Sequence, residues 1–162
     1  MDTDSESSPP TDSFPRRLPS RHQDARDSPG FLLWRVSNIW QQKIRQALKP
    51  FGLTHVQFVL LAVTTKLAED KKAVNQTELA RAAATDKMMT SQVVRALVEK
   101  GLLDRVDDPN DRRAVLVSPT SNGVLLINEA VQAVEAADDQ YFDRLGQDLP
   151  SFASGLTLLA DG

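Results

Sequence analysis

The sequence predicts a mainly α-helical protein with one short β-hairpin, and three observations support this fold class. Apolar residues recur at intervals of three and four in several segments, which is the period of an amphipathic helix. Residues typical of helix N-caps precede these segments, and glycine or proline follows them. Two short runs of aliphatic and β-branched residues flank the turn-forming stretch DDPNDRRAV at 107–115, which indicates a hairpin.

The composition of the chain limits its function. Its 162 residues, 41% of them hydrophobic, suffice for one domain with appendages. The absence of cysteine excludes a disulfide framework, a cysteine zinc site and a thiol nucleophile. No run approaches the ~20 apolar residues of a membrane span, and the N-terminus is acidic, unlike a signal peptide. We therefore expect a cytoplasmic protein without a membrane partner or a cofactor.

Charge is unevenly distributed along the chain. The net charge is −3, which taken alone argues mildly against a polyanionic ligand. Basic residues nevertheless outnumber acidic ones between residues 30 and 113, whereas residues 114–162 contain one arginine and seven acidic residues. A polyanion would therefore meet the middle of the chain.

The first element follows a tail. Residues 1–29 are rich in Ser, Pro and Asp, so we expect them to be disordered. From Phe31 onward, apolar residues fall on one helical face, and Pro50 and Gly52 end this first helix. Thr54 opens the second helix, where Gln57 completes a capping box. The second helix is apolar nearly all round and should be central and buried.

The third helix is short, and a fourth helix follows it after a break at Thr85. Asn75 and Glu78 are the expected N-cap and capping-box partner of the third helix. Its expected buried residues are Leu79, Ala82 and Ala83. Asp86 is the expected N-cap of the fourth helix, which Gly101 ends. The expected inward face of the fourth helix consists of Thr90, Val93, Val94 and Leu97.

A long helix follows the hairpin and extends to about Gly146, with either Ser118 or Thr120 as its N-cap. Residues on this helix follow an alternating spacing of three and four, interrupted once by an acidic residue: Val124, Ile127, Val131, Val134, Asp138, Tyr141 and Leu145. Such a seam predicts a partner helix. A last helix is expected through Phe152 to Leu159.

The order of these elements is a short helix, a tight turn and a second helix, followed at once by a hairpin, and this is the order of a winged helix-turn-helix. The fourth helix would then read DNA with its outward face, which consists of Lys87, Met88, Ser91, Gln92 and Arg95. Gln can bind adenine, Arg or Lys can bind guanine, and Met can contact a thymine methyl group. A solvated helix surface is the alternative interpretation of this face, and the adjacent hairpin argues against it.

The hairpin carries two arginines at its tip, Arg112 and Arg113. They could simply be solubilising residues paired with nearby aspartates. Pairing of Asp111 with Arg113 would still be compatible with DNA binding, because a carboxylate can orient a guanidinium group.

At this point the chain resembles the multiple antibiotic resistance regulator (MarR) family. The resemblance covers about residues 31–162 and rests on four matches: L-T-x-x-Q-x-x-L-L at Leu53–Leu61, L-A at Leu79–Ala80, M-T-S-Q-V-V-R-A-L-x-x-K-G-L at Met89–Leu102, and D-P-x-D-R-R-A-x-x-V-x-x-T-x-x-G at Asp108–Gly123. The last match is the most specific. Pro119 departs from the family, which commonly has Leu there.

The resemblance implies a homodimer that binds a pseudo-palindromic double-stranded DNA operator, usually as a repressor released by a small ligand. Residues 54–119 would form the DNA-binding domain, and residues 30–53 and 120–162 the helical dimerisation region. Carried over by position, Arg113 looks like the minor-groove arginine, Asp111 its orienting residue, and the outward face of the fourth helix the major-groove set. Arg112 would meet phosphate.

Two other functions compete with transcriptional regulation. An enzyme is disfavoured because His22 and His55 have no nucleophile or metal ligand at a working spacing, so no catalytic or metal-binding residue is assigned. A winged helix that binds only other proteins remains open, since fold does not determine function. Aromatic residues that could line a small-molecule pocket are Trp34, Trp40 and Phe58, although aromatic residues at helical spacing are more often core.

Overall fold

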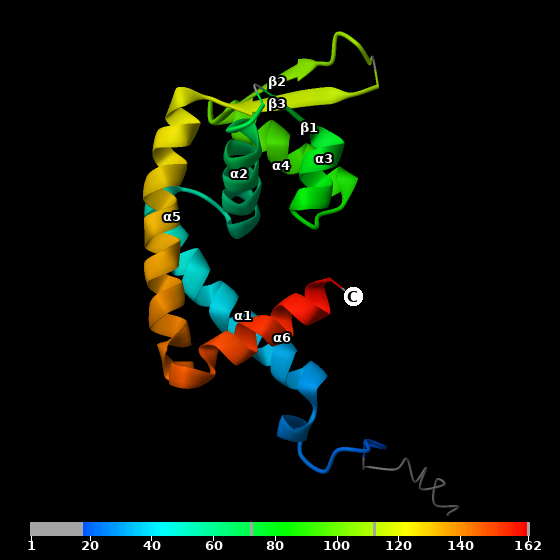
Figure 1. The fold of residues 1–162 in the computed structure, drawn as a ribbon, viewed down its shortest axis with the longest axis vertical. Coiled ribbons are helices and arrows are strands. Elements are labelled where there is room, and N and C mark those ends of the chain that lie inside the picture. Colours follow the sequence, from blue (N-terminus) through cyan, green and yellow to red (C-terminus); the bar gives the residue numbers. More distant parts are fainter. Residues whose placement is uncertain (1–17, 72, 112, 162) are drawn as a thin grey trace, which may run out of the picture. The chain divides into compact units, whose positions relative to one another are not determined.

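The computed structural model describes three stretches of the chain, residues 18–71, 73–111 and 113–161. They belong to two compact units, Met1–Val36 and Ser37–Gly162. Figure 1 shows the elements of both units. The winged helix-turn-helix lies within the second unit.

The first unit contains local structure where the sequence predicts a tail. The 3-10 helix η1 (Ala25–Asp27) begins after Asp24, whose carboxylate accepts the Arg26 backbone N–H at 2.7 Å. Helix α1 (Pro29–Leu48) starts two residues later and continues into the second unit. The tail's first 17 residues lie outside the described residues.

Helix α2 (His55–Ala68) is the central helix of the second unit. The predicted capping box is confirmed: the Gln57 N–H donates to Thr54 Oγ1 at 3.3 Å, and Gln57 Oε1 accepts the Thr54 N–H at 3.1 Å. Its buried residues are Leu60, Leu61 and Thr64. The Thr64 hydroxyl donates to the Leu60 carbonyl at 2.7 Å, so its burial leaves no donor unpaired.

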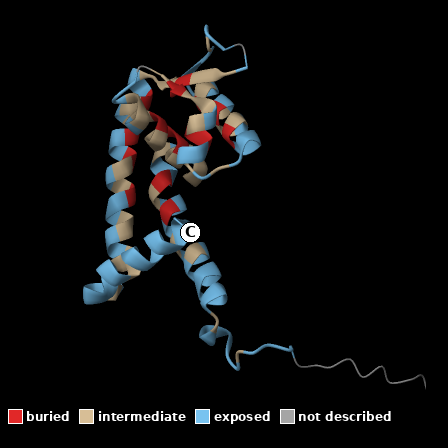
Figure 2. Cartoon of the chain, turned by 45° about the vertical axis from the view of Figure 1, so that its right-hand side comes forward, coloured by how far each residue is buried: buried red, intermediate tan, exposed pale blue. Residues whose placement is uncertain are grey.

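A single apolar core joins the helices and the sheet of the second unit. Its fully buried large apolar side chains come from seven elements and are Ile44, Leu48, Leu60, Leu61, Val74, Leu79, Val94, Leu97, Leu103 and Val117. Figure 2 shows the buried residues gathered where these elements meet. The core therefore fixes the position of α4 and of the hairpin relative to α2.

The helix-turn-helix consists of α3 (Gln76–Ala82) and α4 (Lys87–Glu99). In the turn between them, Ala84 adopts a positive φ of 50°. The Thr85 and Thr90 hydroxyls lie 2.8 Å apart and form a hydrogen bond that links the turn to the first part of α4.

Helix α3 differs from the expectation in two respects. Asn75 caps it as predicted, by accepting the Thr77 N–H at 2.8 Å, but Glu78 is not a capping-box partner. The Glu78 carboxylate instead accepts a hydrogen bond from Lys71 Nζ at 2.7 Å, and Lys71 lies outside α3. The predicted burial of Ala82 is wrong: Ala82 is exposed, and the residues that face α2 and α4 are Leu79 and Ala80.

The sheet has three antiparallel strands in the order β1-β3-β2. The predicted hairpin is confirmed as β2 (Leu103–Asp107) and β3 (Val115–Pro119). The third strand, β1 (Val74–Asn75), directly precedes α3, and its Val74 pairs with Val117. The sheet thereby brings the start of α3 to the base of the hairpin.

Helix α5 (Ser121–Phe142) has Thr120 as its N-cap, which decides between the two alternatives. The predicted seam covers the core of its own chain, because Ile127 and Val134 are buried and Val131 packs against the same cluster. The partner of this face is α2. The seam is therefore no evidence for a second chain.

The chain ends with η3 (Asp143–Asp148) and α6 (Leu149–Ala160). Gly146 has a φ of 50°, which permits the change of direction before α6. Phe142 and Phe152 lie with ring centroids 5.9 Å apart. None of the residues of α6 is buried.

Candidate nucleic-acid interface

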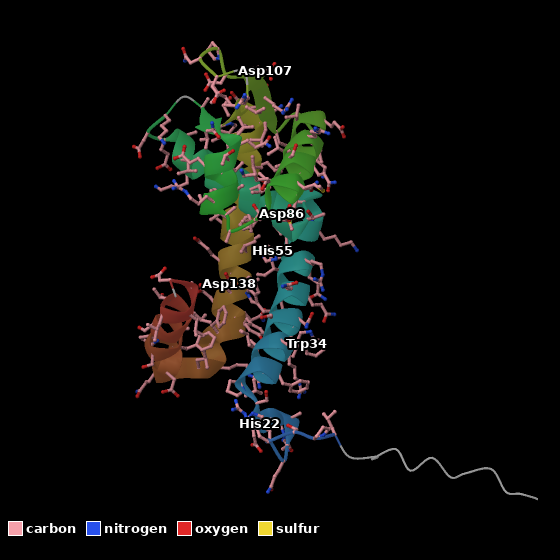
Figure 3. The ribbon with its side chains drawn as sticks, turned by 90° about the vertical axis from the view of Figure 1, so that its right-hand side faces the viewer. His22, Trp34, His55, Asp86, Asp107 and Asp138 are labelled. Atoms are coloured by element: carbon pink, nitrogen blue, oxygen red, sulfur yellow. The ribbon has the colours of Figure 1, made fainter. Side chains whose placement is uncertain are left out.

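Helix α4 is anchored by its inner face. Asp86 Oδ1 accepts the Met89 N–H at 2.8 Å and caps the helix, as predicted (Figure 3). Thr90, Val94 and Leu97 are completely buried, and Val93 is half-buried. Because the core holds this face, the opposite face is presented to solvent in a fixed orientation.

The outer face of α4 carries the residues that the sequence predicts to read DNA. Four of these residues are exposed, namely Lys87, Met88, Gln92 and Arg95, and Ser91 is half-buried. Among the described residues, no carboxylate forms an ion pair with Lys87 or Arg95. Met89, to which the sequence assigned no role, is also 41% exposed. This face can therefore donate hydrogen bonds and attract an anion without first breaking an ion pair.

Two aspartates shape the loop of the wing, residues 108–114. Asp108 Oδ1 accepts the Asn110 N–H at 2.8 Å, and the Asp108 N–H donates to the Ala114 carbonyl at 3.0 Å. The Ala114 N–H donates in turn to the Asp111 carbonyl at 2.8 Å. These bonds close a loop that is longer than a two-residue turn and that projects beyond α3 (Figure 1).

The side chain of Asp111 acts on the backbone. Its Oδ1 accepts the Arg113 N–H at 2.9 Å, and among the described residues it forms no ion pair with the Arg113 guanidinium. Asp111 therefore orients the chain that carries Arg113 and leaves the guanidinium available. Arg112, the other predicted tip arginine, lies outside the described residues.

A groove lies between α3 and the wing. Its volume is about 430 Å³, and it is lined by Asn75, Thr77, Glu78, Arg81, Asp111, Arg113 and Ala114. No functional residue was predicted on α3. The signal that could have revealed this surface is Arg81, a cation on the solvent-facing side of a helix beside the wing.

Backbone contacts join the end of α4 to the start of α5. Gly101 adopts a φ of 69° after α4, and its carbonyl accepts from Thr120 Oγ1 at 2.7 Å. The same Thr120 Oγ1 accepts the Gly123 N–H at 3.0 Å, and the Thr120 N–H donates to the Leu102 carbonyl at 3.1 Å. A Cβ atom on Gly123 would lie 2.1 Å from that carbonyl oxygen, so only glycine fits this approach.

A lysine makes a second connection at the same end of α4. Lys100 Nζ donates to the Gly52 carbonyl at 2.6 Å and to Gln57 Oε1 at 3.2 Å. Gly52 ends the turn after α1, and Gln57 lies in the first turn of α2. The C-terminal end of α4 is thus bonded to three other elements of the unit.

A polar cluster joins α1, α2 and α5 within the second unit. Trp40 Nε1 donates to Asp138 Oδ1 at 2.6 Å, and the Trp40 ring meets the His55 ring edge-on at 5.1 Å. Figure 3 labels His55 and Asp138. Burial lowers the pKa of His55; the Asp138 carboxylate opposes this effect and Arg45 adds to it. Asp138, which interrupts the predicted seam, therefore has a defined partner.

A cavity of about 490 Å³ lies between α1 and α5 within the second unit. Its lining residues are Ile39, Lys43, Gln46, Ala47, Ala137, Gln140, Tyr141 and Arg144. The three aromatic residues predicted to line a pocket are not among them. Trp34 belongs to the first unit, where it is 63% exposed and stacks on Phe31, and Phe58 packs against the core.

The described stretches contain neither a metal-binding cluster nor a single membrane-spanning helix. Among their residues, no three His, Cys, Asp or Glu side chains are grouped to hold a metal ion. No single helix there is long and apolar enough to cross a membrane, although α1 with η2 and α2 pass on length and composition as a bent pair.

Comparisons with known proteins identify the family of this chain. Residues 53–115 match the MarR family. The uncharacterized HTH-type transcriptional regulator YdcH of Bacillus subtilis is 40% identical over 137 residues, which cover 85% of this chain and 92% of YdcH. An HTH-type transcriptional repressor of Mycobacterium tuberculosis is 31% identical over 122 residues, covering 75% of this chain and 85% of the repressor.

Solved structures show the same architecture. BpsR of Bordetella bronchiseptica, studied for the regulation of its DNA binding by 6-hydroxynicotinic acid, is 28% identical with a TM-score of 0.76, covering 84% of this chain and 95% of BpsR. The repressor CouR of Rhodococcus jostii, bound to a 23-mer DNA duplex, is 26% identical with a TM-score of 0.74, covering 83% of this chain and 94% of CouR. The match of residues 53–115 to the MarR family and the identity with YdcH over most of both chains, together with the winged helix-turn-helix, show that this chain belongs to the MarR family of HTH-type transcriptional regulators.

Proposed function

We propose that this protein is a repressor that binds a pseudo-palindromic operator as a homodimer and leaves the operator when a small ligand binds. The observation that carries the proposal is the exposed face of α4, which presents two cations without ion-pair partners among the described residues, beside a wing that carries Arg113. Helix α4 would enter the major groove, and Arg113 the neighbouring minor groove. The structure of CouR bound to a 23-mer DNA duplex supports DNA binding by this fold.

Dimerisation is supported by α6. Apolar residues on this helix are exposed, with Leu156 at 40%, Leu158 at 77% and Leu159 at 74%. Exposed apolar residues grouped in this way are typical of a protein interface. A dimer would present two recognition helices about 34 Å apart, one turn of B-DNA. Sedimentation at micromolar concentration should show a dimer, and a monomer would refute this part of the proposal.

Release by a ligand is supported by the cavity between α1 and α5 and by BpsR, whose DNA binding is regulated by 6-hydroxynicotinic acid. Participation of Trp34, Trp40 and Phe58 in ligand binding stays a prediction. Tryptophan fluorescence measured with candidate ligands, in the wild type and in Trp34→Phe and Trp40→Phe variants, would test it. A ligand that lowers DNA affinity without changing either tryptophan would exclude both tryptophans.

DNA binding is tested by selecting bound fragments from genomic DNA and sequencing them. A pseudo-palindromic sequence should be enriched, and affinity for it should fall steeply with salt. The alternative, a winged helix that binds only proteins, predicts no enrichment and no salt-dependent retention of DNA. The DNA-reading proposal is favoured over this alternative by Lys87 and Arg95 of α4 and by Arg113 of the wing, which have no ion-pair partners within the described stretches.

A further inference from the structure

We propose that Arg81 on α3 forms a third DNA contact, a site for the backbone phosphate that separates the groove read by α4 from the groove entered by the wing. This inference rests on the proposed DNA binding and extends it to a helix that carries none of the residues assigned so far. Phosphate contacts position a protein on DNA, whereas base contacts select the sequence. Arg81 would therefore set the register of the complex.

The shape of the surface supports the site. Arg81 lines one wall of the groove between α3 and the wing, and Arg113 lines the other. The pairing of Val74 with Val117 holds these walls together, because β1 leads directly into α3 and β3 leads back from the wing. The sheet, as well as the loop, therefore determines how far apart the two walls of the groove lie.

The charges in the groove leave both guanidinium groups available. Glu78, one helical turn before Arg81, would be its natural partner, but Lys71 Nζ holds that carboxylate at 2.7 Å. Asp111 is similarly engaged with the backbone N–H of Arg113. Among the described residues, neither Arg81 nor Arg113 forms an ion pair. The groove thus holds two unpaired cations and two carboxylates that already have donors.

DNA geometry identifies the anion. One sugar-phosphate strand separates a major groove from the adjacent minor groove. When α4 occupies the major groove and the wing occupies the minor groove, the sugar-phosphate strand between the two grooves must pass the protein element that lies between α4 and the wing. Helix α3 contacts α4 and shares the groove with the wing, so it is that element. Helix-turn-helix proteins generally place their first helix across the backbone, and a guanidinium group binds phosphate with two parallel hydrogen bonds.

Fluorescence anisotropy over a salt series would test the site, with the selected operator and a scrambled duplex as probes. Arg81→Ala should weaken the binding of both duplexes about tenfold per half-site, the scale of one charge-assisted hydrogen bond, and should lower the salt slope by about one per half-site. The preference for operator over scrambled DNA should stay within about twofold, because a phosphate carries no sequence information. Arg81→Lys should retain the slope.

Lys66→Ala is the matched control. It removes the same charge from the same unit, but Lys66 pairs with Glu69 at 2.6 Å and lies outside the groove. Its salt slope should match the wild type. An equal loss in Lys66→Ala would show a general charge effect and overturn the site. Thermal melting should show that Arg81→Ala folds like the wild type, because Arg81 is exposed.

A second measurement locates the phosphate. Operators carrying one neutral methylphosphonate linkage at a time should bind the wild type more weakly when the linkage borders the minor groove under the wing. A neutral linkage at that position should not change the affinity of Arg81→Ala for the operator. The phosphate site would be refuted if Arg81→Ala bound both duplexes as tightly as the wild type, or if it lost affinity for the operator alone. Either result would leave the proposed DNA binding intact. If the wild type shows no salt-dependent DNA binding, the proposed function itself fails.

Discussion

Replacement of Gly123 by alanine would test the contact between α5 and the end of α4. The added Cβ would lie 2.1 Å from the Leu102 carbonyl oxygen and 3.0 Å from its carbonyl carbon. An ordinary carbon–oxygen contact is about 3.3 Å or more, so the two backbone segments must separate by roughly 1 Å. Both contacts are to backbone, and no side-chain rotation can relieve them.

The expected loss in the free energy of unfolding follows from the interactions that this separation breaks. The Thr120 N–H to Leu102 bond would be lost, at about 1 kcal/mol. The cap between Thr120 Oγ1 and the Gly123 N–H would be weakened, at about 1 kcal/mol. Residual crowding adds about 1–3 kcal/mol, and the better helix propensity of alanine returns about 1 kcal/mol. Gly123→Ala should therefore lower the free energy of unfolding by about 2–4 kcal/mol.

Urea unfolding followed by circular dichroism would measure this difference. Gly30→Ala is the control, because Gly30 also lies in a helix but a Cβ added there would have nothing within 4 Å. It should not lower the unfolding midpoint. If Gly123→Ala were as stable as the wild type, the close approach of α5 to Leu102 would not exist in solution.

Three other changes probe the turn, the polar cluster and the wing. Ala84→Gly should raise the free energy of unfolding by about 0.5–1 kcal/mol, because glycine tolerates the φ of 50° better; a lower melting temperature would contradict this account. Burial lowers the pKa of His55 in the folded state, so stability present near neutral pH should be lost as pH falls below the ordinary histidine value of 6.5. His55→Gln should flatten this dependence in urea unfolding between about pH 5 and 8; an unchanged profile would assign it to other groups. Arg113→Ala should weaken operator binding by roughly 1–3 kcal/mol per half-site, and Arg113→Lys should recover little because it lacks the planar fork. Anisotropy measures both, and wild-type affinity in Arg113→Ala would show that the wing does not read DNA.

Features that depend on nearby residues could be predicted from the sequence. The caps at Thr54 and Asp86 were predicted correctly because a cap needs only a side-chain oxygen and an N–H three residues later. The hairpin was predicted because both of its strands and its turn lie within 17 residues, 103–119. For the N-cap of α5, the sequence left two alternatives, and the structure selects Thr120 because its hydroxyl also reaches the Gly101 carbonyl.

Features that depend on distant residues could not be predicted. Heptad spacing identifies an apolar face of α5 but not what covers it, and the structure covers it with α2 of the same chain. Asp138 interrupts that face because it accepts from Trp40, which lies 98 positions earlier. Arg81 was not predicted because its neighbour Arg113 is brought beside it only by the pairing of β1 with β3. The residues assigned to base reading on α4 stay predictions until DNA contacts are measured.

The connections at the C-terminal end of α4 add to the buried contacts of Thr90, Val94 and Leu97, so that α4 can rotate only together with the elements that hold it. Lys100, Gly101 and Leu102 fix that end to its neighbours, while the residues of the reading face begin at Lys87, at the opposite end. With 13 residues, α4 is about 20 Å long at 1.5 Å per residue. A rotation of about 5° around the fixed end would displace the far end by roughly 1.7 Å, more than the ~0.5 Å range over which an N–H to oxygen hydrogen bond keeps its length. Small rotations transmitted through α5 or α2 would therefore be enough to displace the α4 side chains that we propose to contact bases, without unfolding any part of the domain.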